Sequence, residues 1–206
     1  TGLLEAVAIE GTPAPGTPVR NYSTMLLGGL GDNGKTAFTA QLTGSPSVFG
    51  AFLGVAGSVD NLARERSDVP NLPVGSYFVI VSGPVGGVRS SPGISGPGAI
   101  AFYSGVYNAG TGEGSYGIWS DRSGALAPIV QLGQAASGYP AGSTIDSMGV
   151  SVFSLVPKIN DFGDVAFAAT VSGPGVDPNE RSVYVEQQGT FNAVARTSSV
   201  VPGADS

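Results

Sequence analysis

Apolar and polar residues alternate in short runs along most of the chain, and clusters of Gly, Pro, Asn and Asp separate these runs. In residues 165–171, for example, Val165, Phe167, Ala169 and Val171 occupy every second position. Residues at alternate positions of a β-strand point to the same face of the sheet, so this pattern is typical of strands with one buried face. The chain is therefore predicted to be built from β-strands.

The predicted strands fall into three groups of four. The first group comprises residues 24–30, 35–42, 48–55 and 58–64. The second comprises residues 77–81, 99–106, 117–120 and 125–132, and the third comprises residues 148–155, 165–171, 182–187 and 190–196. Because tight turns join antiparallel neighbours, each group is expected to form a meander.

An eight-residue motif introduces one strand of each group. It occurs at residues 31–38, 95–102 and 160–167. Each copy has a glycine at the fourth place and ends in Ala-Phe, and the glycines Gly34, Gly98 and Gly163 are 64 and 65 residues apart. The motif predicts a tight turn with the glycine at positive φ, followed by a strand. The chain thus contains an internal repeat.

A second segment is repeated four times, at residues 2–8, 57–63, 124–130 and 189–195. Each copy has a glycine, an apolar residue two places later and an apolar pair five and six places later, and Pro and Gly residues follow. These Pro and Gly residues divide the chain into a surplus N-terminal strand segment, residues 1–16, and three β-repeat units, residues 17–75, 76–142 and 143–206.

The predicted fold class is all-β, with three tandem four-stranded antiparallel sheets that resemble β-propeller blades. A closed propeller typically has about four to eight blades. The three units therefore belong to a longer array, complete a ring with other chains, or stack linearly. The sequence leaves these three arrangements open.

The eight-residue motif resembles the N-x-x-G-x-x-A-F repeat of secreted bacterial and archaeal tandem-repeat proteins, the choice-of-anchor, β-propeller-like surface proteins. The third copy, residues 160–167, matches in full, whereas the other two replace the leading Asn with Gly31 and Ser95. We expect these two turns to be built differently. The resemblance implies an exported, often surface-attached β-repeat protein, and it implies no known activity.

Composition narrows the chemistry further. Among 206 residues there are 33 Gly and 15 Pro, which argue against long helices, and no His or Cys. The absence of both excludes Ser-His-Asp triads, thiolate chemistry and His-ligated metals. A net charge of -6 with only nine Lys and Arg disfavours nucleic acid. No apolar run is long enough for a membrane span, so we expect an extracellular or cell-surface protein that does not insert into membranes.

The copy of the second repeat at the N-terminus has no strand before it with which to pair. Unpaired apolar strands tend to add to the edge of another sheet. We therefore expect an assembly contact at Gly2, Leu3, Leu4, Ala6, Val7 and Ile9. The alternatives are that the strand pairs within its own chain or with a preceding piece of the same polypeptide.

Three other features suggest chemistry. Asn160, Asp161 and Asp164, or Asp32 and Asn33, offer oxygens for a structural calcium ion, although no cofactor is expected. Turn carboxylates of this kind usually cap the backbone and are rarely catalytic. Tyr107 and Tyr116 are candidates for stacking on a glycan, whereas Trp119 is expected in the core. Asn21 begins an Asn-Tyr-Ser glycosylation sequon.

The sequence therefore predicts a non-enzymatic extracellular structural protein that forms a homo-oligomer or polymer. A lectin-like module that uses loop aromatics is the second hypothesis. A carboxylate-dependent hydrolase is the third.

Overall fold

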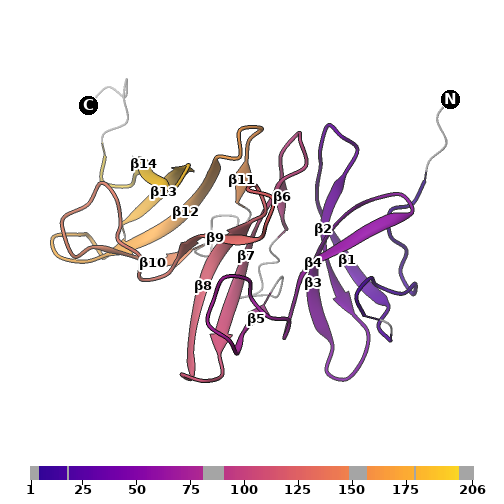
Figure 1. Cartoon of the computed structure of the whole chain (residues 1–206). Helices are drawn as coiled ribbons and strands as arrows, with labels where there is room; N and C mark the ends of the chain where they lie inside the picture. Colours follow the sequence, from indigo (N-terminus) through magenta and orange to yellow (C-terminus); the bar gives the residue numbers. More distant parts are fainter. Residues whose placement is uncertain (1–4, 18, 81–90, 149–156, 179, 200–206) are drawn as a thin grey trace.

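The structure is a computed structural model, and it describes residues 5–17, 19–80, 91–148, 157–178 and 180–199. The described residues form strands, turns and irregular segments. Among them there is no helix long and apolar enough to cross a membrane. The strands make three antiparallel sheets that follow one another in a row (Figure 1), which confirms the predicted all-β class.

The first sheet contains β1 (Tyr22–Leu30), β2 (Thr36–Leu42), β3 (Val48–Val55) and β4 (Ser58–Arg64), paired in chain order. The second sheet contains β5 (Ser76–Ile80), β7 (Ile100–Asn108), β8 (Glu113–Ser120) and β9 (Ala127–Gln131) in that order. The short strand β6 (Gly93–Ile94) also pairs with β7. The third sheet contains β10 (Thr144–Met148), β12 (Val165–Ser172), β13 (Arg181–Gln187) and β14 (Thr190–Arg196), and β11 (Lys158–Ile159) pairs with β12. Each sheet lies within one of the three predicted repeat units.

The three motif turns have the same backbone structure. In each, the amide of the first motif residue donates to the carbonyl of the fifth, and the glycine amide donates back to the carbonyl of the first, at 2.8 to 3.1 Å. Gly34, Gly98 and Gly163 have φ of 78°, 97° and 84°. This left-handed conformation requires glycine because a Cβ would clash with the backbone.

The side chain that accepts from the fifth motif amide differs between the turns. Asn160 accepts from Asp164 at 2.9 Å, and Ser95 accepts from Ala99 at 3.0 Å. In the first turn, where glycine replaces the leading Asn, Asn33 accepts from Lys35 at 3.0 Å. An oxygen two residues further along thus substitutes for the missing side chain.

Two apolar cores lie between adjacent sheets. Phe78, Phe102 and Trp119 of the second sheet pack against the first sheet in one core. Val165, Phe167 and Tyr184 of the third sheet pack against the second sheet in the other. A third cluster covers the remaining face of the first sheet, where Phe38 and Phe52 stack with ring centroids 5.3 Å apart.

The sheets also meet along their inner edges, where β6 contacts both β1 and β11. A Cβ on Gly28 would lie 2.2 Å from the Pro92 carbonyl oxygen, and one on Gly93 would lie 2.3 Å from that of Pro157. Glycine is therefore needed where two sheets approach most closely. The motif turns add links, because Asn33 Nδ2 donates to the Pro97 carbonyl at 2.6 Å and the Gly96 amide donates to Asp161 Oδ1 at 2.7 Å.

Candidate functional site

Every sheet has an inner face that carries a pair of large aromatic residues, and an outer face, which in the first two sheets points toward the next sheet along the chain. The inner face carries an aromatic pair at equivalent registers, which are Phe38 and Phe52, Phe102 and Trp119, and Phe167 and Tyr184. A β-bulge follows Ala51, Ile118 and Val183 in the three sheets, so their outer faces correspond position by position. The repeat therefore preserves both faces.

The outer faces of the first two sheets are covered by the next sheet. Ala37, Ala51 and Ala63 of the first sheet are at most 3% exposed beneath the second sheet. Ala101, Ile118 and Val130 of the second sheet are equally buried beneath the third. The alanines of the first sheet leave room for the aromatic side chains of the second, whereas the outer face of the second sheet also contributes larger side chains, among them Tyr103, to its core with the third.

The outer face of the third sheet has the same pattern and is open. Ala168 pairs with Val183, which pairs with Ala195, as Thr39 pairs with Ala51 and Ala51 with Ala63 in the first sheet. Val183 is 39% exposed, and Ala195 is also exposed. Ala168, Val183 and Ala195 line a shallow hollow of about 150 Å³ together with Arg181 and Arg196. We call this surface the third-sheet outer face.

Behind this face, Glu180 fixes the end of the third sheet. Glu180 is 3% exposed and accepts hydrogen bonds from the hydroxyls of Tyr139, Thr197 and Ser198. Burial alone would raise the pKa of Glu180, but these hydrogen bonds outweigh burial and lower its pKa. The Arg196 guanidinium lies 4.8 Å from the centroid of the Tyr139 ring. These three hydrogen bonds join Tyr139 and residues 197–198 to the residue that precedes β13.

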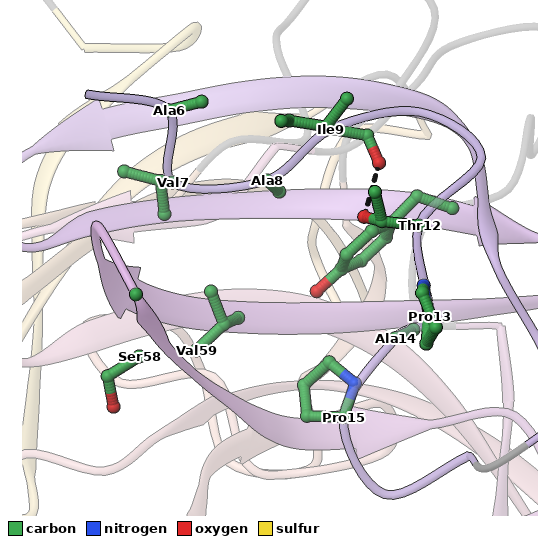
Figure 2. A pocket seen from close by; sticks show the side chains of 12 residues that line it. Ala6, Val7, Ala8, Ile9, Thr12, Pro13, Ala14, Pro15, Ser58 and Val59 are labelled. Atoms are coloured by element: carbon green, nitrogen blue, oxygen red, sulfur yellow. Dashed lines mark hydrogen bonds between the residues drawn. The ribbon is translucent and has the colours of Figure 1, made fainter. Parts of the chain in front are cut away.

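At the opposite end of the molecule, the N-terminal segment covers the inner face of the first sheet. The amide of Gly11 donates to the Tyr22 carbonyl and that of Ala14 to the Arg20 carbonyl, which fixes residues 11–14 beside β1. Residues 5–9 lie across the sheet, where Val7 and Ala8 pack on the apolar cluster. Figure 2 shows this segment above Val59, with the Ile9 side chain pointing away from it. Ile9 is 57% exposed.

A groove separates residues 6–9 from Pro13, Pro15 and the β3–β4 turn (Figure 2). It has a volume of about 470 Å³ and also contacts Tyr22. The Tyr22 hydroxyl is buried and has no hydrogen-bond partner among the described residues, and burial raises the pKa of Tyr22 to about 12. The groove is therefore mostly apolar, with a neutral phenol in its wall.

The prediction of an N-terminal strand is wrong for residues 5–9, the part of that segment that the structure describes. Residues 5–9 form no strand, because their apolar side chains pack on the face of the first sheet and not at a sheet edge. Of the predicted contact residues, Val7 is half-buried while Ala6 and Ile9 are exposed. Gly2, Leu3 and Leu4 lie outside the described residues.

The predicted calcium ligands serve the motif turns. Asn160 Oδ1 accepts from the amides of Phe162 and Asp164, and Asp164 Oδ2 accepts from the side chains of Asn160 and Gln187. These hydrogen bonds, led by that from Gln187, lower the pKa of Asp164. Asp32 and Asp161 both approach Gly96 from neighbouring turns. Within the described residues, no group of three or more carboxylates is arranged to hold a metal ion.

The other predicted residues are dispersed. Tyr107 lies in β7 and Tyr116 in β8, not in loops, and both are half-buried. Tyr107 packs against Tyr77, whereas Tyr116 stacks on Tyr103. Trp119 is fully buried, as predicted. Asn21 is half-buried just before β1, where its backbone pairs with Thr43.

Sequence reasoning missed an ion pair between the second and third sheets. Arg122, in the β8–β9 turn, contacts both carboxylate oxygens of Glu186 and donates to the Gly163 carbonyl at 2.9 Å. Glu186 is 1% exposed. The signal was present, because Glu186 falls on the buried face of a predicted strand and a buried carboxylate requires a partner.

Comparison with known families gives one match, over residues 86–206, to a family of unknown function, DUF7453. The matched region is more than half of the chain. The chain belongs to DUF7453. The DUF7453 region starts before β6 and includes β7 to β14, and thus also the third-sheet outer face. No curated protein and no solved structure matches the chain.

Proposed function

We propose that the protein is a non-enzymatic structural protein of the cell exterior that self-assembles into a filament or ring through contacts between the β-sheets of adjacent subunits. One observation carries the proposal. The third-sheet outer face carries Ala168, Val183 and Ala195 at the registers that the first two sheets bury against their neighbours, yet Val183 is 39% exposed. A second copy of the chain is the partner that we propose for this face.

The two interfaces inside the chain serve as a template for the contact between chains. In both, the outer face of one sheet is covered by the inner face of the next, which carries a pair of aromatic residues. The apolar surface thus removed from water stabilises each interface. Exposed apolar faces of this kind mark association sites on soluble proteins. The third-sheet outer face has the shape and chemistry to accept one more such contact.

A structural role also agrees with the bonding of the polar groups. The carboxylates of Asp161 and Asp164 accept hydrogen bonds that hold turns, and Glu180 and Glu186 hold the third sheet in place. We assign the protein to the cell exterior on the sequence resemblance of its eight-residue motif.

Light scattering on the purified chain tests the proposal. We expect the wild-type mass to rise above the 20.5 kDa of one chain as the concentration increases. Val183→Arg places a charge on the third-sheet outer face and should restore the mass of one chain. Val74→Arg is the matched control. Val74 is fully exposed, and it lies outside any strand in the segment that connects β4 of the first sheet to β5 of the second. This variant should associate like the wild type.

A wild-type chain that keeps the mass of one subunit at every concentration would overturn the proposal. Equal association of Val183→Arg and wild type would also exclude the third-sheet outer face as the contact.

A further inference from the structure

We propose that the third-sheet outer face of one copy docks on residues 5–10 of the next copy, with Ile9 inserted into the hollow formed by Ala168, Val183 and Ala195. This inference rests on the proposed function and names the partner surface for it. The contact joins two different surfaces, so it is heterologous and runs head to tail.

The position of the two surfaces favours such a contact. Residues 5–10 cover the inner face of the first sheet, which no other sheet covers. The hollow lies on the outer face of the third sheet, at the opposite end of the row of sheets (Figure 1). In the intact chain, an outer face always meets the inner side of the following sheet. Head-to-tail docking continues this order with one difference, because residues 5–10 lie between the outer face of one copy and the aromatic pair Phe38 and Phe52 of the next. Such a series gives a filament, or a ring if the rotation between copies closes.

The shapes of the two surfaces are complementary. Ile9 is a large apolar side chain that is 57% exposed and points away from the sheet beneath it. The hollow is lined by two alanines and a valine, and its volume of about 150 Å³ is suited to one apolar side chain. An apolar anchor in a small pocket is the usual centre of a specific interface.

The charges of the two surfaces are complementary as well. Glu5 and Glu10, on either side of the groove-lining residues 6–9, are exposed. Arg181 and Arg196 line the hollow on the other surface. Opposite charges around an apolar centre fix the register of two partners and disfavour pairing of like surfaces. They therefore oppose back-to-back association of two third sheets.

The groove beside residues 6–9 offers a further contact. Tyr22 is 3% exposed, and its hydroxyl has no partner among the described residues. Trp119 Nε1 and the Tyr184 hydroxyl also lack partners there, but both lie between two sheets of the same chain, whereas Tyr22 lines a groove that is open to a neighbour. The hydroxyl itself is buried, so the further contact would be made by the apolar walls of the groove around Tyr22, Val59 and Pro15.

Cysteine crosslinking tests the inference, since the chain has no cysteine of its own. Ile9→Cys and Ala195→Cys chains are prepared separately, one with an affinity tag, mixed and treated with a short bismaleimide. We expect tagged-to-untagged dimers in the mixture and little dimer in either variant alone. Val74→Cys replaces Ile9→Cys in the control mixture, where the dimer yield should fall at least about tenfold.

A second measurement tests the same contact without crosslinking, in case the two cysteines are too far apart or wrongly oriented to react. Ile9→Asp should weaken association by about tenfold or more, because it removes an apolar anchor and adds a charge to the interface. Val19→Asp, at another exposed valine, should leave association unchanged.

The outcomes separate the two proposals. Absence of association in the wild type overturns both. Association that Val183→Arg abolishes but Ile9→Asp leaves intact, with crosslinks in Ala195→Cys alone, overturns only the head-to-tail inference, because the third sheets then meet back to back.

Discussion

The outer faces of the first and third sheets have matching residue types at matching registers, and they differ in what covers them. Ala51 is fully buried beneath the second sheet, whereas its counterpart Val183 is 39% exposed. Ala63 is 3% exposed, and its counterpart Ala195 is also exposed. The comparison teaches that in the first two units the outer face is covered by the next sheet, whereas the same registers of the third sheet are exposed. The buried face contributes to folding, and we propose that the exposed one contributes to assembly.

Substituting arginine on each of the two faces should give the largest difference in the free energy of unfolding. Ala51→Arg forces a charge between two sheets and should cost about 4 kcal/mol or more in the free energy of unfolding. Val183→Arg leaves the new side chain in water and should change that free energy by about 0.5 kcal/mol or less. Urea unfolding under dilute, monomeric conditions measures both. Equal losses would show that the two faces do not differ as described.

The ion pair sharpens the comparison for the interface between the second and third sheets. Arg122→Ala removes the cationic partner of the buried Glu186, which keeps its hydrogen bond from the Gly189 amide, and should destabilise the fold by about 3 kcal/mol. Arg20→Ala is the control, because the Arg20 side chain donates to the carbonyls of Thr43 and Pro46 within the first sheet, and it should cost about 1 kcal/mol. Glu186→Gln in the Arg122→Ala background should recover part of the loss. Thermal unfolding of the four proteins decides whether the pair acts as described.

Tyr22 lies at the end of the molecule that the N-terminal segment covers, and Tyr184 lies between the second and third sheets. Both should make the free energy of unfolding depend on pH, and only at high pH. Burial raises the pKa of Tyr22 and of Tyr184 from 10.0 to about 12. A raised pKa favours the protonated folded state, so this stability is fully present below pH 10 and is lost as the pH rises toward 12. Absorbance at alkaline pH should show Tyr22 and Tyr184 ionising together with unfolding. Ionisation of Tyr22 well below the unfolding transition would mean that residues 5–9 do not shield it.

The sequence predicted the sheets well where its patterns are long. The bounds of β3, β4 and β14 agree with the predicted strands, and Gly34, Gly98 and Gly163 mark the turns as predicted. The two-residue strands β6 and β11 were missed, because two residues show no alternation. The strand predicted at residues 148–155 falls largely outside the described residues.

The candidate site was predicted only in part. The alternation in β12 and β13 identifies an outer face, but a strand pattern does not say which faces are covered, so the third-sheet outer face required the structure. Residues 2–8 resemble a strand in composition, yet residues 5–8 form no strand, and Val7 and Ala8 pack on the apolar face of the first sheet. Arg122 and Glu186 are too far apart in the chain for local patterns to pair them.

Molar mass against concentration, for the wild-type chain beside Val183→Arg, tests the central claim most directly. The account predicts a wild-type mass that grows from 20.5 kDa into a series of multiples, and a variant that stays at 20.5 kDa. A wild-type chain that remains at that mass throughout would contradict it.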